Sequence, residues 1–148
     1  VLNSTDTLQT VAGLWNNTAP SATTFTLGND SGVNSNSNSY VAFLFATLAG
    51  VSKVGSYTGN GSYQTINCGF SAGARFILVK STQAAYNWIL IDSLRGIVSG
   101  NDPYLQIDNS SASIANIDVV DPHNSGFIVN NHGDVNTSGH VYIFYAIA

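Results

Sequence analysis

The sequence contains an internal repeat that constrains its architecture more than any other feature. Residues 23–46 align without a gap on residues 125–148, at a spacing of 102 positions. Each copy reads as a strand, a polar turn and an apolar strand, and a match at a fixed spacing is typical of repeat architectures. The identical pairs are Phe25 and Phe127, Asn29 and Asn131, Val33 and Val135, Asn34 and Asn136, Tyr40 and Tyr142, and Ala46 and Ala148.

The repeat predicts an uneven domain organisation. If each copy ends at the shared alanine, residues 47–148 form one complete unit and residues 1–46 are the back part of a preceding unit. The similarity of Leu2–Thr5 to residues 107–111 supports this division, and the chain begins with Val rather than Met. We therefore expect a piece of a longer fibre protein, in which residues 1–46 pack on the rest to give one compact domain.

Composition favours an all-β fold. Only 8% of the residues are charged, Met and Glu are absent, and Asn, Ser, Thr and Gly are abundant. Good helix formers are therefore scarce, whereas β-branched and aromatic residues are frequent. Short strand patterns separated by turn residues indicate an antiparallel β-sandwich or jelly roll with an internal hairpin repeat.

The strand patterns can be placed individually. Residues 40–46 and 141–147 are apolar enough to be buried strands in equivalent positions, and Gly59–Gly61 carries a tight hairpin signal between two strands. Residues 121–125 are expected to be a turn, while residues 117–120 are either a strand or an irregular edge. The other predicted strands are residues 23–28, 51–58, 63–70, 75–80, 86–92, 104–107 and 127–130.

Charge and apolar content exclude several function classes. The net charge is −4 and the chain has four Lys and Arg residues in total, too few for a nucleic-acid-binding stripe. No apolar run reaches the length of a membrane span, so membrane insertion is not expected. The single cysteine, Cys68, rules out an intrachain disulfide and is expected to be a small buried side chain.

No motif predicts catalysis or a cofactor. Residues 69–73 match the G-x-S-x-G pattern, but a strand rather than a helix follows, so Ser71 is expected to lie in a turn and not to be a nucleophile. The absence of Glu and of a recognisable acid pair argues against a glycosidase. His123, His132 and His140 are spaced too widely for a typical metal site, although His132 and His140 flank one turn, and the aspartates match no calcium loop.

Four aromatic residues are the candidates for ligand binding. Trp15, Tyr57, Tyr63 and Tyr104 lie in or beside predicted turns, where exposed rings could stack on a sugar. The alternative is that they belong to the core, as aromatic side chains in β-sandwiches commonly do.

Several segments resemble a β-rich repeat found in virion and tail-fibre proteins of bacteriophages, itself a domain of unknown function. The similar segments are residues 15–20 (WNNTAP), 55–62 (GSYTGNGS), 76–80 (FILVK), 88–96 (WILIDSLRG) and 142–148 (YIFYAIA). The resemblance implies a location in a virion, on a tail fibre or other surface appendage, and brings no reaction with it.

The expected function follows from the resemblance and the residues together. We expect a non-enzymatic structural and adhesive module that self-associates into a fibre and presents polar loops to a host-surface glycan. The alternative is a carbohydrate-binding module of a secreted bacterial protein or adhesin. A hydrolase acting through Ser71 is a third hypothesis, which the strand after Gly73 disfavours.

Overall fold

The computed structural model describes residues 4–9 and 11–148, and it divides into two compact units. Unit 1 comprises Phe45–Ala148 together with the residues up to Thr7, and unit 2 is Leu8–Leu44. The expected similarity at Leu2 and Asn3 lies outside the described residues. The boundary between the units falls within the apolar run at residues 40–46.

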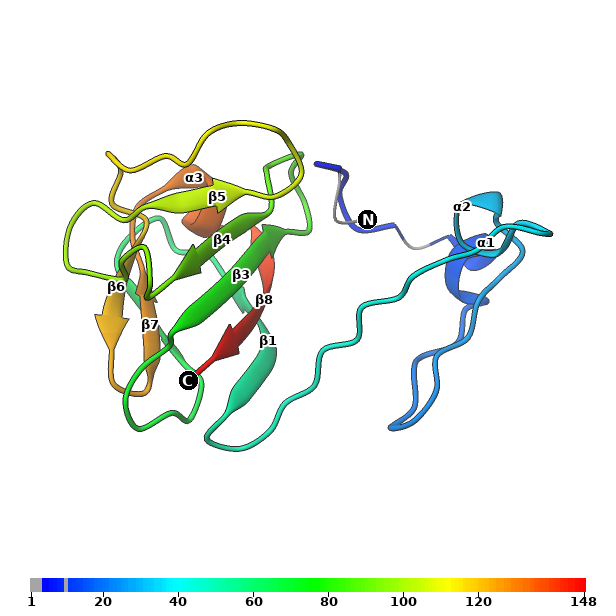
Figure 1. The fold of residues 1–148 in the computed structure, drawn as a ribbon, viewed down its shortest axis with the longest axis horizontal. Coiled ribbons are helices and arrows are strands. Elements are labelled where there is room, and N and C mark those ends of the chain that lie inside the picture. Colours follow the sequence, from blue (N-terminus) through cyan, green and yellow to red (C-terminus); the bar gives the residue numbers. More distant parts are fainter. Residues whose placement is uncertain (1–3, 10) are drawn as a thin grey trace. The chain divides into compact units, whose positions relative to one another are not determined.

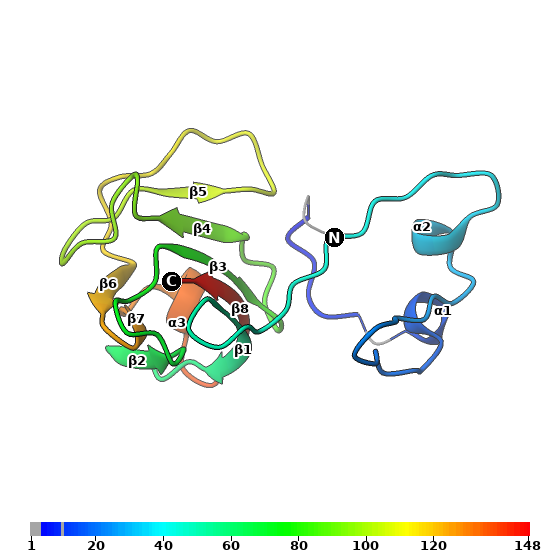
Figure 2. The same cartoon turned by 60° about the horizontal axis from the view of Figure 1, so that its bottom comes forward.

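Unit 1 is a sandwich of two antiparallel sheets, which confirms the predicted all-β class (Figure 1). The larger sheet has the order β1-β8-β3-β4-β5 and the smaller has the order β2-β7-β6, as the rotated view in Figure 2 also shows. The strands are β1 (Ser52–Thr58), β2 (Gln64–Asn67), β3 (Phe76–Ser81), β4 (Ile89–Asp92), β5 (Tyr104–Gln106), β6 (Val120–His123), β7 (Gly126–Val129) and β8 (Val141–Ile147).

Helical structure in the described residues is limited to three single turns, as the scarcity of helix formers predicts. They are α1 (Ala12–Trp15), α2 (Ser31–Asn34) and α3 (Gly133–Asn136). Both α1 and α2 belong to unit 2, whereas α3 lies between β7 and β8 and contacts β3.

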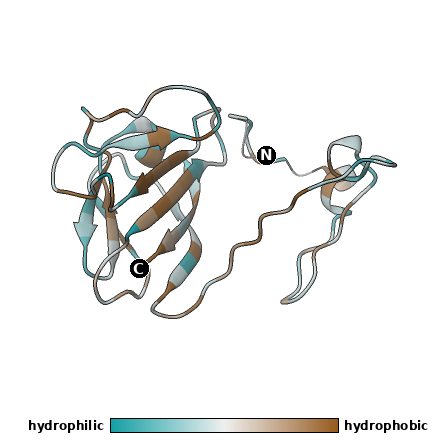
Figure 3. Ribbon diagram, viewed as in Figure 1, coloured by the Kyte–Doolittle hydropathy of each residue, from teal (hydrophilic) through white to brown (hydrophobic). Residues whose placement is uncertain are grey.

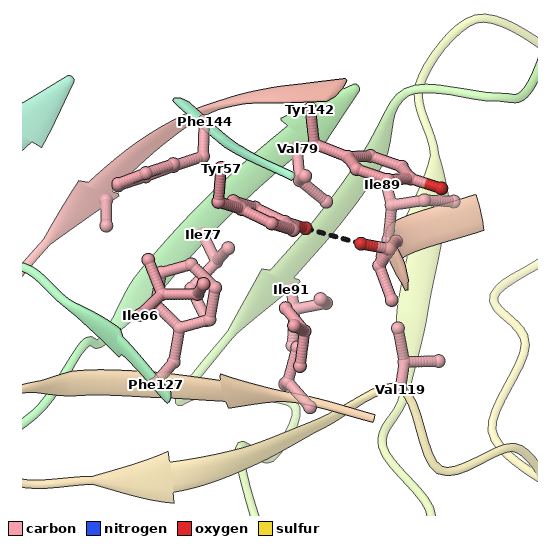
Figure 4. Packing of buried hydrophobic residues seen from close by; sticks show 14 of the residues in the cluster. Tyr57, Ile66, Ile77, Val79, Ile89, Ile91, Val119, Phe127, Tyr142 and Phe144 are labelled. Atoms are coloured by element: carbon pink, nitrogen blue, oxygen red, sulfur yellow. Dashed lines mark hydrogen bonds between the residues drawn. The ribbon is translucent and has the colours of Figure 1, made fainter. Parts of the chain in front are cut away.

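The core of unit 1 lies between the two sheets, where apolar side chains from both layers meet (Figure 4). Strand β8 contributes Tyr142, Phe144 and Ala146, which alternate with more exposed residues as a pleated strand requires. Phe127 from the smaller sheet packs edge-on against Phe144, with ring centroids 5.6 Å apart. The hydrophobic colouring follows the same pattern and is concentrated along β3 and β4 (Figure 3).

Two expected hairpins are instead connections between the sheets. Strand β1 pairs with β8 and β2 pairs with β7, so the glycine-rich turn after β1 carries the chain from one sheet to the other. The repeated segment behaves in the same way, because β7 belongs to the smaller sheet and β8 to the larger. Turn residues indicate where a strand ends, but the pairing depends on which apolar faces bury each other.

The region 117–125 also differs from the expectation. Strand β6 covers Val120–His123 and pairs with β7, so most of the predicted turn is a strand and the preceding residues form none. The strand is an edge strand, where Pro122 is tolerated because no hydrogen bond is needed from its nitrogen.

The strands expected at residues 23–28 and 40–46 are wrong. These residues form no strand, and Val41, Phe43 and Leu44 are 82%, 67% and 74% exposed. The corresponding strand β8 lies between β1 and β3, and its backbone is hydrogen-bonded on both sides. The described residues of unit 2 contain no such flanking strands, so the run has nothing to pair with.

Asp102 organises the loops at the far edge of unit 1, and its side chain is fully buried. One carboxylate oxygen accepts a hydrogen bond from the Val98 N–H at 3.0 Å, and the other accepts from Val119 and Val120 at 3.3 and 3.0 Å. Burial raises the pKa of Asp102 above its ordinary value, and the three N–H donors oppose that shift.

We predict that Tyr57→Phe lowers the free energy of unfolding by about 1–2 kcal/mol, because the buried Val135 carbonyl loses its donor. The Tyr57 hydroxyl donates to that carbonyl at 2.6 Å. Urea unfolding measures the effect, and Tyr63→Phe at an exposed position is the matched control. Equal stability of the two variants would contradict the assignment.

We further predict that Asp102→Ala costs about 2–4 kcal/mol, because the buried N–H groups of Val119 and Val120 and the partly buried N–H of Val98 lose their acceptor. Asp102→Asn removes the ionisation and keeps one oxygen. Since the folded-state pKa is raised, the stability that comes from proton binding at Asp102 is fully present below about pH 3.8 and is lost as the pH rises through the folded value. The free energy of unfolding of the wild type, relative to that of Asp102→Asn, should therefore fall from acidic to neutral pH in urea titrations. A rise over the same pH range would contradict the predicted direction.

Candidate ligand-binding site

Two of the four predicted ligand-binding aromatics are core residues, and the prediction is corrected for them. Tyr57 is 8% exposed and stacks on Tyr142, while Tyr104 is 2% exposed. Their rings face the interior because each lies on an inward position of its strand. The neighbouring turn residues had suggested exposure, but the strand period decides where a side chain points.

Trp15 lies in unit 2, immediately before a left-handed turn at Asn16 and Asn17. It is 46% exposed and lines a mostly apolar hollow with Thr18, Pro20, Phe25 and Thr26. The repeat suggests that this hollow consists of core residues that are left uncovered, because Phe127, the counterpart of Phe25, is completely buried in the core of unit 1. An exposed ring here is therefore not by itself a ligand platform.

Tyr63 is the candidate whose geometry suits binding. It lies between β1 and β2, and 63% of it is exposed. Trp15 belongs to the other unit, and Tyr57 and Tyr104 are buried, so Tyr63 is the exposed member of the three predicted aromatics of unit 1.

The loop that carries Tyr63 is fixed by the buried side chain of Asn136. The Asn136 carbonyl oxygen accepts from the Asn60 N–H at 2.9 Å, and its amide nitrogen donates to the Asn60 side chain and the Ser62 carbonyl. The Asn136 backbone carbonyl accepts from the Gly61 N–H at 3.0 Å. The side-chain amide and the backbone carbonyl of one buried residue thus hold three successive residues of the loop.

Backbone hydrogen bonds join the same loop to the segment before β8. Gly59 donates to the His140 carbonyl at 2.8 Å, and Gly139 donates to the Gly59 carbonyl at 2.9 Å. Gly59 packs so closely on Thr137 that a β-carbon there would overlap the Thr137 carbonyl. The two loops therefore form one rigid edge of the sandwich.

We call the exposed part of this edge the Tyr63 surface; it consists of Asn60, Ser62, Tyr63 and Ser138. It offers amide and hydroxyl groups beside one aromatic ring and carries no formal charge. Such groups can exchange hydrogen bonds with sugar hydroxyls while the ring covers an apolar sugar face. Sequence reasoning identified Tyr63 but not Asn136, whose Asn-rich context gave no sign of burial.

A second, shallow hollow lies beside the β6–β7 turn and was not predicted. It brings together Arg75, Ser93 and the consecutive residues His123 and Asn124 from three segments of the chain, which explains why no sequence motif marks it. The His123 Nδ1 lies 3.0 Å from the Ser125 hydroxyl and 3.2 Å from the Ser125 N–H, so the imidazole caps its own turn. Arg75 makes this the hollow better suited to an acidic group.

Ser71 and the three histidines considered in the sequence analysis lie in turns or pack against neighbouring side chains. Ser71 lies in the connection between β2 and β3, where a turn was predicted. His132 packs edge-on to Tyr104, and His140 stacks on Tyr86. Among residues 4–9 and 11–148, no group of three His, Cys, Asp or Glu side chains is arranged to hold a metal ion.

In the part of the chain that the structure describes, no helix has the length and apolar character needed to cross a membrane.

Comparison with known proteins adds the family. No curated protein and no solved structure matches the chain. The model of a domain of unknown function, DUF7483, matches residues 1–148, so the chain belongs to the DUF7483 family.

Proposed function

We propose that this protein is a non-enzymatic structural and adhesive module whose Tyr63 surface binds a glycan. The observation that carries the proposal is an exposed tyrosine on a loop held by the buried Asn136 amide. Most exposed loops are mobile, and ordering them on binding costs free energy. A loop that is already ordered avoids that cost.

The chemistry of the surface favours a neutral sugar. Asn60, Ser62 and Ser138 supply donors and acceptors without charge, and Tyr63 supplies the stacking face. Aromatic contacts of this kind contribute about 0.5–1.5 kcal/mol beyond the area they bury. One such surface gives weak binding, so useful attachment requires many copies, which an oligomeric fibre provides.

The setting we propose is a tail fibre or other appendage of a phage virion, on the basis of the sequence resemblance. The alternative is a carbohydrate-binding module of a secreted bacterial protein or adhesin. Both place the same glycan-binding surface on the same sandwich, and they differ in what the module is attached to. Self-association into a fibre belongs to the first setting only.

We predict that Tyr63→Ala abolishes detectable binding on a glycan array while leaving thermal stability unchanged, because the ring is exposed. Leu94→Ala is the matched control, since Leu94 is 97% exposed on a different loop. Arg75→Gln distinguishes the Tyr63 surface from the hollow beside the β6–β7 turn: it should leave binding of neutral glycans intact.

The same array reports on catalysis, because bound glycans can be recovered and analysed for cleavage. Recovery of intact glycan is expected. Equal binding by Tyr63→Ala and Leu94→Ala would overturn the assignment of the Tyr63 surface, and loss of binding only in Arg75→Gln would move the site to the second hollow.

A further inference from the structure

The apolar run in unit 2 follows a turn whose hydrogen bonds reproduce those before β8. Helix α2 corresponds to α3 at the repeat spacing of 102 positions. The Tyr40 hydroxyl donates to the Ser31 carbonyl at 2.8 Å and accepts from the Ser35 N–H at 2.8 Å. The Tyr142 hydroxyl makes the corresponding bonds with Gly133 and Thr137, at 2.7 and 2.9 Å.

The likeness extends to the residue that ends the turn. Ser37 has a left-handed backbone with φ of 65°, and its counterpart Gly139 has φ of 81°. A non-glycine residue adopts that conformation at a cost, so the shared geometry is not a default of the chain. The turn of unit 2 is therefore formed as it is in the complete sandwich, although the strand after it is not.

The apolar side chains at matched positions differ sharply in burial. Each is fully buried in unit 1, and its counterpart in unit 2 is not. The pairs are Phe127 at 0% and Phe25 at 39% exposed, Val129 at 0% and Leu27 at 37%, and Tyr142 at 0% and Tyr40 at 45%. Unit 2 therefore has the inward-facing residues of a sandwich core, but its described residues form no opposing sheet.

We propose that residues 39–45 are a donor strand that takes the place of β8 between two strands of the β1 and β3 type, supplied by another copy of this fold. The pairing of β8 defines the register. Tyr142 lies opposite Tyr57 and Ser81, and Ile147 lies opposite Ser52 and Phe76. Tyr40 and Phe45 occupy the corresponding ends of the donor strand.

Strand β8 and residues 39–45 differ in the size of their inward side chains. This difference predicts which residues the partner strand should carry. Phe144 packs against Gly55, where an added β-carbon would lie 2.8 Å from the Phe144 ring. The counterpart of Phe144 in unit 2 is Ala42, which would leave a cavity over a glycine. The partner strand should therefore carry a larger residue at the position of Gly55, so it is a related copy rather than an identical one.

This inference concerns assembly and does not depend on glycan binding. Its first test is a chimera of the full chain in which residues 141–147 (VYIFYAI) are replaced by the sequence of residues 39–45 (SYVAFLF). The control carries residues 38–44 (NSYVAFL) in the same place, which turns the tyrosine outward. We expect cooperative thermal unfolding for the chimera and its loss in the control.

Gly55→Ala supplies the matched test of size. It should lower the Tm of the wild-type chain, where the alanine meets the Phe144 ring, and raise the Tm of the chimera, where it fills the space. A chimera that unfolds no more cooperatively than the shifted control, or a Gly55→Ala effect of the same sign in both chains, would overturn the proposal.

The second test observes the donor strand directly. In a full chain whose residues 141–147 are replaced by alternating Gly and Ser, Val41→Cys should form a disulfide with Ser56→Cys, since Ser56 lies opposite Ile143 in the wild type. Ala42→Cys, on the other face, is the control. Burial raises the pKa of the Cys68 thiol to about 11, which keeps it unreactive in mild oxidant.

In this variant the vacated β8 position of unit 1 stands in for that of the related partner. A disulfide within one chain or between two chains therefore supports the proposal, because either places the segment in the register of β8. Equal cross-linking by Val41→Cys and Ala42→Cys would overturn it. If the chain without β8 does not fold, the chimera still decides the outcome. Binding of the intact chain to phosphatidylcholine vesicles through residues 40–45 would assign the run to a lipid surface instead, and would also overturn it.

Discussion

The pairing of β8 with β1 and β3 is the interaction on which the rest of the sandwich depends. β8 is the last strand in the sequence, yet it lies second in the larger sheet, with hydrogen-bonded neighbours on both sides. It also supplies Tyr142 and Phe144 to the core, where they contact Tyr57 and Phe127. The larger sheet is therefore complete only when the last strand of the unit pairs with the first. This pairing joins residues that are far apart in the sequence.

The candidate binding surface is a consequence of that closure. When β8 pairs with β1, the loop that follows β1 and the loop that precedes β8 are brought together at one edge of the sandwich. Asn136 is buried between them and satisfies backbone groups of the Asn60–Ser62 segment. Because the amide is buried, its hydrogen bonds do not compete with water, so the loop is held more firmly than a surface turn would be. The backbone next to Tyr63 is thus held in place by a buried residue.

Unit 2 shows how much of this structure is local. Its turn forms with the same hydrogen bonds as in unit 1, because a helical turn, a left-handed residue and a tyrosine hydroxyl are all specified within ten residues. Its strands do not form, because a β-strand satisfies its backbone groups only through neighbouring strands. An apolar run of this kind with unpaired backbone is a template for pairing with another chain.

The sequence by itself determined the all-β class, most strand positions in unit 1, the turn at Ser71 and the repeat of 102 positions. These features are recorded in local composition and period, which one segment carries without reference to others. The sequence also indicated Tyr63, because a tyrosine beside a glycine-rich turn is readily exposed. Tertiary structure alone decided which strands pair, that Tyr57 and Tyr104 face the core, and that Asn136 is the buried residue holding the Tyr63 loop. It also decided that residues 40–46 are not a strand although their counterpart is, since burial and pairing depend on segments far apart in the chain.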